Sequence, residues 1–161
     1  MISKKTRFLA HASIIAALYV VLTYLATLLG LSSNAVQIRF SEALTVLAAY
    51  TPAAIPGLFI GCFLSNIFAG GVIWDILFGS LATLLGALGT YALKKHKYLA
   101  PLPPIIANTL IVPFVLRYAY SAPGSIGYFM LTVGAGEVIS CGILGILLIT
   151  AVNKLENRIN W

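Results

Sequence analysis

Apolar residues dominate the chain in long stretches, which short polar, glycine-rich or proline-rich segments separate. A helix that crosses the hydrocarbon core of a bilayer needs roughly 20 predominantly apolar residues. The pattern predicts six transmembrane helices in a single transmembrane domain that comprises residues 1–161. Their expected bounds are about 8–29, 40–51, 55–70, 74–93, 105–120 and 128–152.

The second and third spans are short, because they share residues 40–69. Pro52 and Pro56 exclude one long helix there, since each proline removes a helical hydrogen bond and clashes with the preceding turn. We therefore expect a short helix, a bend over residues 51–56 and a second helix. Small residues, which let another helix approach closely, then recur at every fourth position, at Gly57, Gly61, Ser65 and Ala69.

The composition is that of an all-α integral membrane protein. Hydrophobic residues make up 60% of the chain and charged residues 9%, whereas a soluble domain carries about 25% charged residues. The net charge of +6 could suit nucleic acid, but the basic residues cluster at the ends of spans, at residues 4–7, 94–97 and 154–158. The positive-inside rule accounts for this placement, so the expected partner is the lipid bilayer and not nucleic acid.

The basic clusters also predict the topology. With six spans, all three clusters fall on one side of the membrane, which predicts cytoplasmic N- and C-termini. With five spans, the cluster at 94–97 would lie opposite the N-terminus. Six spans are therefore the better interpretation.

Five charged residues lie within or at the ends of apolar segments. A charge at the centre of a span costs on the order of 3 kcal/mol, so such a residue is a candidate for function. In the six-span arrangement all five lie in the outer half or at the middle of the membrane, which predicts a polar pocket open to the outside. These residues are Arg39, Glu42, Asp75, Arg117 and Glu137.

Most of these charges also have a purely structural explanation. Arg39 and Glu42, placed at the outer rim, are three apart and could pair with each other. Asp75 could complement a helix dipole, and Arg117 could extend to lipid headgroups. Glu137 lies too deep for such explanations and has small helical neighbours, so we expect it to face the interior and bind a ligand.

Polar amides and aromatic residues accompany these charges. Asn66 and Asn108 could each form a hydrogen bond between helices or bind the edge of a nucleobase, since an amide both donates and accepts. Trp74 and Tyr118 belong to an aromatic group that is either an interfacial belt or a stacking wall for a flat ligand. The other members of that group are Phe78, Tyr120, Tyr128 and Phe129.

Several kinds of chemistry are missing from the sequence. His11 and His96 have no metal-ligand spacing with carboxylates, and neither is placed to activate a serine or cysteine nucleophile. The chain has no phosphate-binding Gly-Lys-Ser/Thr motif. Cys62 and Cys141 are expected to be buried thiols. The sequence thus predicts no catalytic residue, no metal and no cofactor. A pocket without an energy source implies either passive binding or a partner that supplies energy.

The first span contains two pairs of small residues four apart, Ala12 with Ala16 and Ser13 with Ala17. This spacing lets another helix approach closely in a bilayer. The neighbour could be a helix of the same chain or of a partner subunit.

Three runs of sequence resemble the QueT family of substrate-binding subunits (S components) of energy-coupling factor (ECF) transporters. They are QIRFSEAL at 37–44, PAAIPGLFIGCFLSN at 52–66 and GAGEVISCGILG at 134–145. The resemblance implies a multi-pass protein of the bacterial cell membrane that is not an enzyme. It would capture a queuosine precursor outside and release it inside, together with a transmembrane coupling subunit and two ATPase subunits. Ala12 and Ala16 match the signature for docking on the coupling subunit.

The resemblance further implies a ligand such as 7-aminomethyl-7-deazaguanine (preQ1). Its guanine-like edge would present two N–H donors to one carboxylate, for which we favour Glu137. Its aminomethyl cation would need a second acid, Asp75 or Glu42. Asn66 or Asn108 would donate to the carbonyl oxygen. The alternatives are an S component for another flat vitamin, such as thiamine or riboflavin, and a small membrane-embedded enzyme or assembly factor.

Overall fold

The computed structural model describes residues 3–31 and 36–156, and every regular segment in that part of the chain is helical. Part of the predicted turn at 30–34 and all of Arg158 fall outside the described residues. The main helices are α1 (Lys4–Leu28), η1 (Phe40–Ala49), α2 (Ala54–Phe68), α3 (Ile73–Ala92), α4 (Leu102–Phe114), α5 (Ile126–Glu137) and α6 (Gly145–Glu156). Shorter helical segments are η2 (Lys97–Leu99), η3 (Val115–Ala119) and η4 (Val138–Leu144).

Four helical stretches of the described chain are long and apolar enough to cross a membrane, and they confirm the prediction of an all-helical multi-pass membrane protein. They are Lys4–Leu28, Ile73–Ala92, Lys97–Ala119 and Ile126–Leu155. In the last two stretches a π-helical segment, η3 or η4, continues directly from the preceding α-helix. The apolar helices η1 and α2 are shorter, with 10 and 15 residues.

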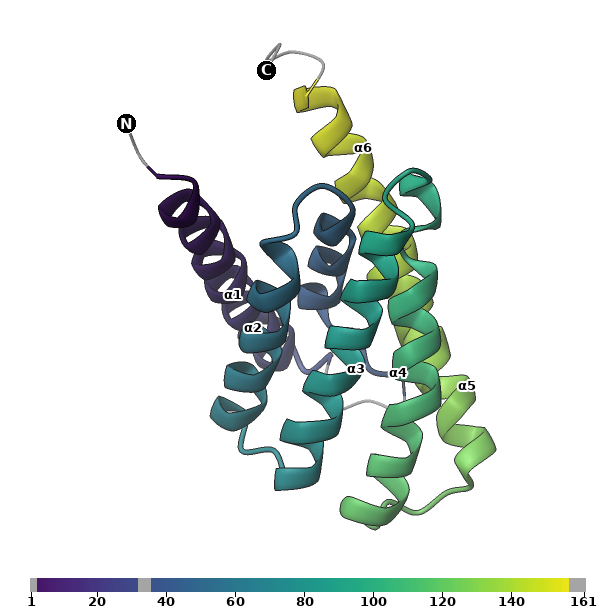
Figure 1. The fold of residues 1–161 in the computed structure, drawn as a ribbon. Helices are drawn as coiled ribbons and strands as arrows, with labels where there is room; N and C mark the ends of the chain where they lie inside the picture. Colours follow the sequence, from purple (N-terminus) through teal and green to yellow (C-terminus); the bar gives the residue numbers. More distant parts are fainter. Residues whose placement is uncertain (1–2, 32–35, 157–161) are drawn as a thin grey trace.

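The helix η1 begins inside the bundle and not at its outer rim. Residues 37–39 precede it without helical structure, and Figure 1 shows η1 starting about halfway along the molecule. The helix is of the 3₁₀ type, whose rise of about 2.0 Å per residue lets ten residues cover about 20 Å. The two prolines lie at the bend between η1 and α2, as expected. Pro52 lies in the turn, and Pro56 lies in the first turn of α2, where its missing N–H costs no hydrogen bond.

The small residues of α1 and α2 pack against each other. A Cβ atom on Gly57 would lie 2.7 Å from the Ala12 carbonyl oxygen, and one on Gly61 would lie 3.0 Å from the Ala16 carbonyl oxygen. The glycines of the four-residue repeat in α2 therefore face α1 and not a pocket. The two backbones are close because Gly57 and Gly61 have no side chain where α2 faces Ala12 and Ala16.

Glycine and proline bring α3 and α4 together at one end. A Cβ atom on Gly86 would lie 2.7 Å from the Pro104 Cα atom, and one on Gly89 would lie 2.6 Å from the Pro103 Cβ atom. Buried Thr90 donates a hydrogen bond to the Ala100 carbonyl at 2.7 Å and closes this end.

The connections of the bundle divide between its two ends. Figure 1 shows the first turn of α1, the α3–α4 connection and the last turns of α6 at one end, and the α2–α3 and α4–α5 connections at the other. The described basic residues of all three clusters therefore lie at the same end of the bundle.

Candidate functional site

Two buried carboxylates from distant parts of the sequence meet inside the bundle. Glu42 lies in the first turn of η1 and is 2% exposed, and Glu137 ends α5 and is 8% exposed. The ligating atoms of Glu42, Glu137 and Cys141 lie within 4.8 Å of one another. Because a π-helical segment begins directly after Glu137, the helix is widened at this point, as is common at functional sites.

The two carboxylates have different hydrogen-bond partners. Glu42 accepts a hydrogen bond from the Tyr19 hydroxyl, and the Asn108 amide nitrogen lies 3.5 Å from Glu42 Oε2. Glu137 Oε2 accepts from the Cys141 thiol at 3.1 Å, which is a weak donor. Glu137 therefore retains more capacity than Glu42 to accept hydrogen bonds from a ligand.

These groups surround a small inner cavity of about 20 Å³. This volume accommodates about one water molecule and is too small for a nucleobase. The cavity is lined by Gln37, Arg39, Glu42, Cys62, Gly79, Thr83, Asn108, Val112, Val133 and Glu137.

A larger polar vestibule of about 430 Å³ adjoins the inner cavity. Asp75 lies in it, and its Oδ2 atom accepts a hydrogen bond from the Tyr120 hydroxyl at 2.9 Å. Asn66 donates to the Asp75 backbone carbonyl at 3.4 Å. The vestibule is lined by Thr23, Thr27, Gln37, Arg39, Asn66, Ala69, Gly70, Gly71, Asp75, Val112, Leu116 and Tyr120.

Residues 36–39 separate the vestibule from the inner cavity. Gln37 and Arg39 line both spaces, and so does Val112. The segment rests on α5 and η4, because the Gly136 Cα faces the Gln37 carbonyl so closely that no Cβ atom would fit. The Arg39 backbone N–H also donates to Ser140 Oγ at 3.1 Å. We call residues 36–39 the divider.

The structure changes the interpretation of two charged residues, Arg39 and Glu42. Glu42 was expected at the outer rim but is buried beside Glu137, because the divider carries the chain into the bundle before η1 begins. Arg39 and Glu42 also do not pair, since no ion pair within 4.0 Å joins them although both side chains are described. The Arg39 side chain instead lies at the boundary between the two cavities.

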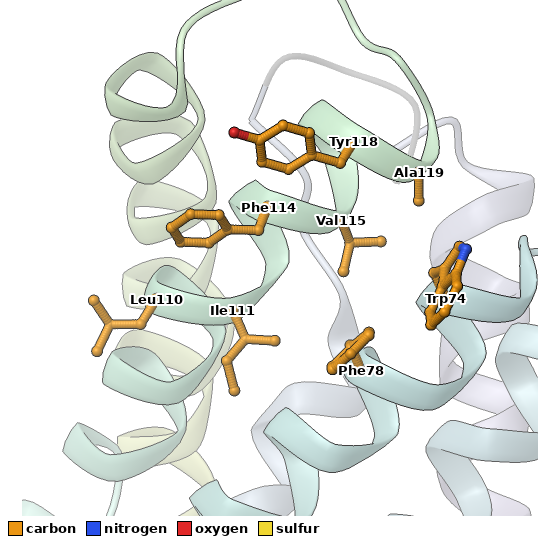
Figure 2. Close-up of a pocket in the computed structure, with 8 residues that line it drawn as sticks. All are labelled: Trp74, Phe78, Leu110, Ile111, Phe114, Val115, Tyr118 and Ala119. Atoms are coloured by element: carbon orange, nitrogen blue, oxygen red, sulfur yellow. The ribbon is translucent and has the colours of Figure 1, made fainter.

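The other predicted residues divide into two groups. Asn108 joins the carboxylates in the inner cavity, and Asn66 joins Asp75 in the vestibule. Trp74 and Tyr118 reach neither space and line a separate apolar groove of about 460 Å³. Figure 2 shows Trp74 on α3 and Tyr118 on the α4–η3 helix at this groove. Arg117 is exposed near them and donates to the Ala122 carbonyl at 3.4 Å.

Sequence reasoning missed Tyr19 and Gln37. Tyr19 is fully buried, and a phenol within an apolar span needs a hydrogen-bond partner, so this signal was present in the sequence. Gln37 lies just before the predicted second span, where a polar side chain is ordinary. Its position between two cavities depends on the course of the backbone.

The site is suited to a polar ligand that carries several hydrogen-bond donors. Ionised carboxylates offer acceptors only, and a ligand that donates to them would offset the cost of burying their charge. Such a ligand would meet Asp75 first and the pair of Glu42 and Glu137 deeper in the bundle.

An all-helical bundle with several helices long and apolar enough to cross a membrane is a multi-pass membrane protein. The family model described as "QueT transporter" matches residues 9–154. The chain therefore belongs to the QueT transporter family, as the three sequence runs indicated.

A named relative gives a narrower comparison. The chain is 36% identical over 99 residues to "Queuosine precursor transporter QueT" of Lactococcus lactis subsp. cremoris (strain MG1363). This match spans 60% of the present chain and 57% of the relative. No solved structure matches the chain.

Proposed function

We propose that this protein is the substrate-binding S component of an ECF-type importer for a queuosine precursor such as preQ1. It would capture the ligand from outside and release it inside with a coupling subunit and two ATPase subunits. The observation that carries the proposal is the pairing of buried Glu42 and Glu137 beneath a polar vestibule. The name of the L. lactis relative supports this class of substrate.

The two carboxylates of the inner cavity suit the guanine-like edge. That edge has two adjacent N–H donors, which one carboxylate accepts in bidentate fashion. Glu137 suits this role because its partner in the structure is the weakly donating Cys141 thiol. Glu42 already accepts a hydrogen bond from Tyr19. We therefore propose that Glu42 stabilises the site and attracts a positively charged ligand.

Asp75 suits the aminomethyl cation. It lies in the vestibule, where a group that projects from the far side of the base would remain. The Tyr120 hydroxyl orients its carboxylate, and a charged hydrogen bond of this kind contributes about 1.5–3 kcal/mol. Asn108 is placed to contact the base because it lines the inner cavity.

Ligand binding would require the divider to move. An inner cavity of about 20 Å³ cannot admit a purine-sized base, whereas the vestibule of about 430 Å³ can. We infer that the ligand enters the vestibule first and that displacement of residues 36–39 opens the way to Glu137. Arg39, at the boundary of both spaces, would move with this segment.

The coupling subunit would dock on the exposed side of α1. Ala12 and Ala16 pack internally against α2, so docking through this pair would require the two helices to separate. Ser13 and Ala17 are exposed on the same helix and have the same spacing. We therefore propose that the second pair forms the contact with the partner.

Calorimetric titration of the purified protein with preQ1, guanine and thiamine tests the proposal. We expect tight binding of preQ1, weaker binding of guanine, which lacks the aminomethyl group, and no heat with thiamine. Heat with thiamine and none with preQ1 would rule out the proposed substrate. Thiamine therefore also tests the alternative of a different flat vitamin.

A further inference from the structure

A third polar cavity lies at the end of the bundle opposite the vestibule. It has a volume of about 440 Å³ and is lined by Lys95, His96, Lys97, Tyr98, Leu99 and Asn153. The first five residues belong to the α3–α4 connection, and Asn153 belongs to α6. Figure 1 shows this connection beside α6, at the end where α1 begins. None of these residues lines the vestibule or the inner cavity.

The charge of this cavity favours an anion. Lys95 and Lys97 line it, and Lys94 and Lys154 adjoin its lining residues in the sequence. Three of the four acidic residues of the chain belong to the vestibule or the inner cavity. The side chain of the fourth, Glu156, lies outside the described part.

The polar groups of the cavity are held in place by one another. The Lys97 ammonium lies 3.9 Å from the centre of the Tyr50 ring, and the Tyr50 hydroxyl donates to Asn153 Oδ1 at 2.7 Å. Because the amide oxygen of Asn153 accepts this hydrogen bond, its NH₂ group is available as a donor. The Lys95 ammonium and the Asn153 amide together form a set of donors that suits the oxygen atoms of a phosphate.

Exposed apolar side chains border the same cavity. Tyr98 is 64% exposed, Leu99 45% and Leu102 47%, and the exposed apolar face continues along α4 through Ile106 and Leu110. A small soluble anion would make no favourable contact with such an apolar surface. A phospholipid has both an anionic phosphate and acyl chains, so it would occupy both parts.

We propose that this cavity binds the phosphate group of an anionic phospholipid, with the acyl chains along the exposed face of α4. Basic pockets between helices at a membrane surface bind anionic headgroups in this way. The aromatic ring of Tyr98 would lie at the level of the headgroups, where tyrosine is enriched. The site is separate from the proposed transport site and does not depend on the identity of its ligand.

Native mass spectrometry of the full chain in detergent, titrated with phosphatidylglycerol or phosphatidylcholine, tests the proposal. We expect the chain to retain phosphatidylglycerol in preference to phosphatidylcholine. Lys95→Gln should weaken phosphatidylglycerol binding roughly fivefold, and Lys95→Gln with Lys97→Gln roughly 25-fold. Lys95 is exposed, so the single substitution leaves the fold intact.

The matched control is Lys4→Gln, which removes an exposed charge at the same end but outside the cavity. Equal weakening by Lys4→Gln and Lys95→Gln would show only general attraction to basic residues and would overturn the site. Equal retention of the two lipids would overturn headgroup recognition. Displacement of phosphatidylglycerol by millimolar inorganic phosphate would show a site for small anions and overturn the assignment to lipid.

Discussion

Tyr19 donates a hydrogen bond to Glu42 and thereby joins the middle of α1 to the first turn of η1. Both side chains are almost completely buried, at 1% and 2% exposure. A buried carboxylate depends on its hydrogen-bond donors, because an unsatisfied polar or charged group inside a protein costs free energy. The phenol is therefore part of the support of the binding site and not only of the helix interface.

Replacement of Tyr19 tests this relationship. We expect Tyr19→Phe to lower the melting temperature of the ligand-free protein and to weaken preQ1 binding about tenfold, since a hydrogen bond to a charged group contributes about 1.5–3 kcal/mol. Thermal unfolding in detergent and calorimetry measure the two effects. Tyr24→Phe is the control on the same helix, because Tyr24 is exposed to the surroundings. Equal effects of the two substitutions would contradict the role of Tyr19.

Glu137 and Asp75 are expected to recognise different parts of the ligand. Glu137→Gln should weaken preQ1 and guanine alike by at least roughly tenfold, because both ligands present the same N–H edge. Asp75→Asn should weaken preQ1 and leave guanine unchanged, because guanine lacks the aminomethyl cation. Calorimetry with both ligands measures the pattern. An equal loss of both ligands in Asp75→Asn would place Asp75 at the base and not at the cation.

The close contact between the divider and α5 gives a third prediction. Gly136→Ala would place a methyl group against the Gln37 carbonyl, with no room for it, and should shift residues 36–39. We expect weaker preQ1 binding with the helical content retained, measured by calorimetry and circular dichroism. Gly127→Ala is the control, because a Cβ atom at Gly127 would meet no atom within 4 Å. Unchanged binding in Gly136→Ala would show that the position of the divider does not matter for the ligand.

The two small-residue pairs of α1 should respond in opposite ways. Ser13→Leu with Ala17→Leu should abolish uptake in cells while the purified protein still binds preQ1, because these residues are exposed. Ala12→Leu with Ala16→Leu should reduce folded protein, because both residues pack against α2 at close range. Uptake assays, expression levels and calorimetry distinguish the outcomes. Normal uptake in the first variant would rule out docking through Ser13 and Ala17.

The sequence predicted which side chains face the interior better than it predicted their neighbours. Glu137 was expected to face inward because its helical neighbours are small, and it is buried in the structure. The pairs in α1 and α2 were each predicted to pack closely, yet the sequence did not show that Ala12 and Gly57 are partners. Hydrophobic periodicity identifies the face of a helix but not the helix that covers it.

The positions of Glu42 and Trp74 differ from the arrangement that the sequence suggested, for specific reasons. Glu42 was assigned to the rim on the assumption that a span begins at the membrane surface, whereas the divider takes the chain inward without helical structure. Trp74 was grouped with the ligand-binding residues by its height along α3, but it faces a groove on another side of the helix. The sequence alone predicts neither the path of the backbone over residues 36–39 nor the side of α3 on which Trp74 lies.

The course of residues 36–39 has a consequence for hydration. Backbone without helical structure is tolerated at membrane depth only where protein groups or water satisfy its N–H and C=O groups. The Ile38 N–H bonds to the Leu31 carbonyl, and the Arg39 N–H bonds to Ser140, while Gln37 borders the vestibule. Water in the vestibule would therefore reach this part of the backbone, at the boundary of the inner cavity. A solute would travel that far without leaving water and would lose its hydration shell only in the last step, beside Glu42 and Glu137.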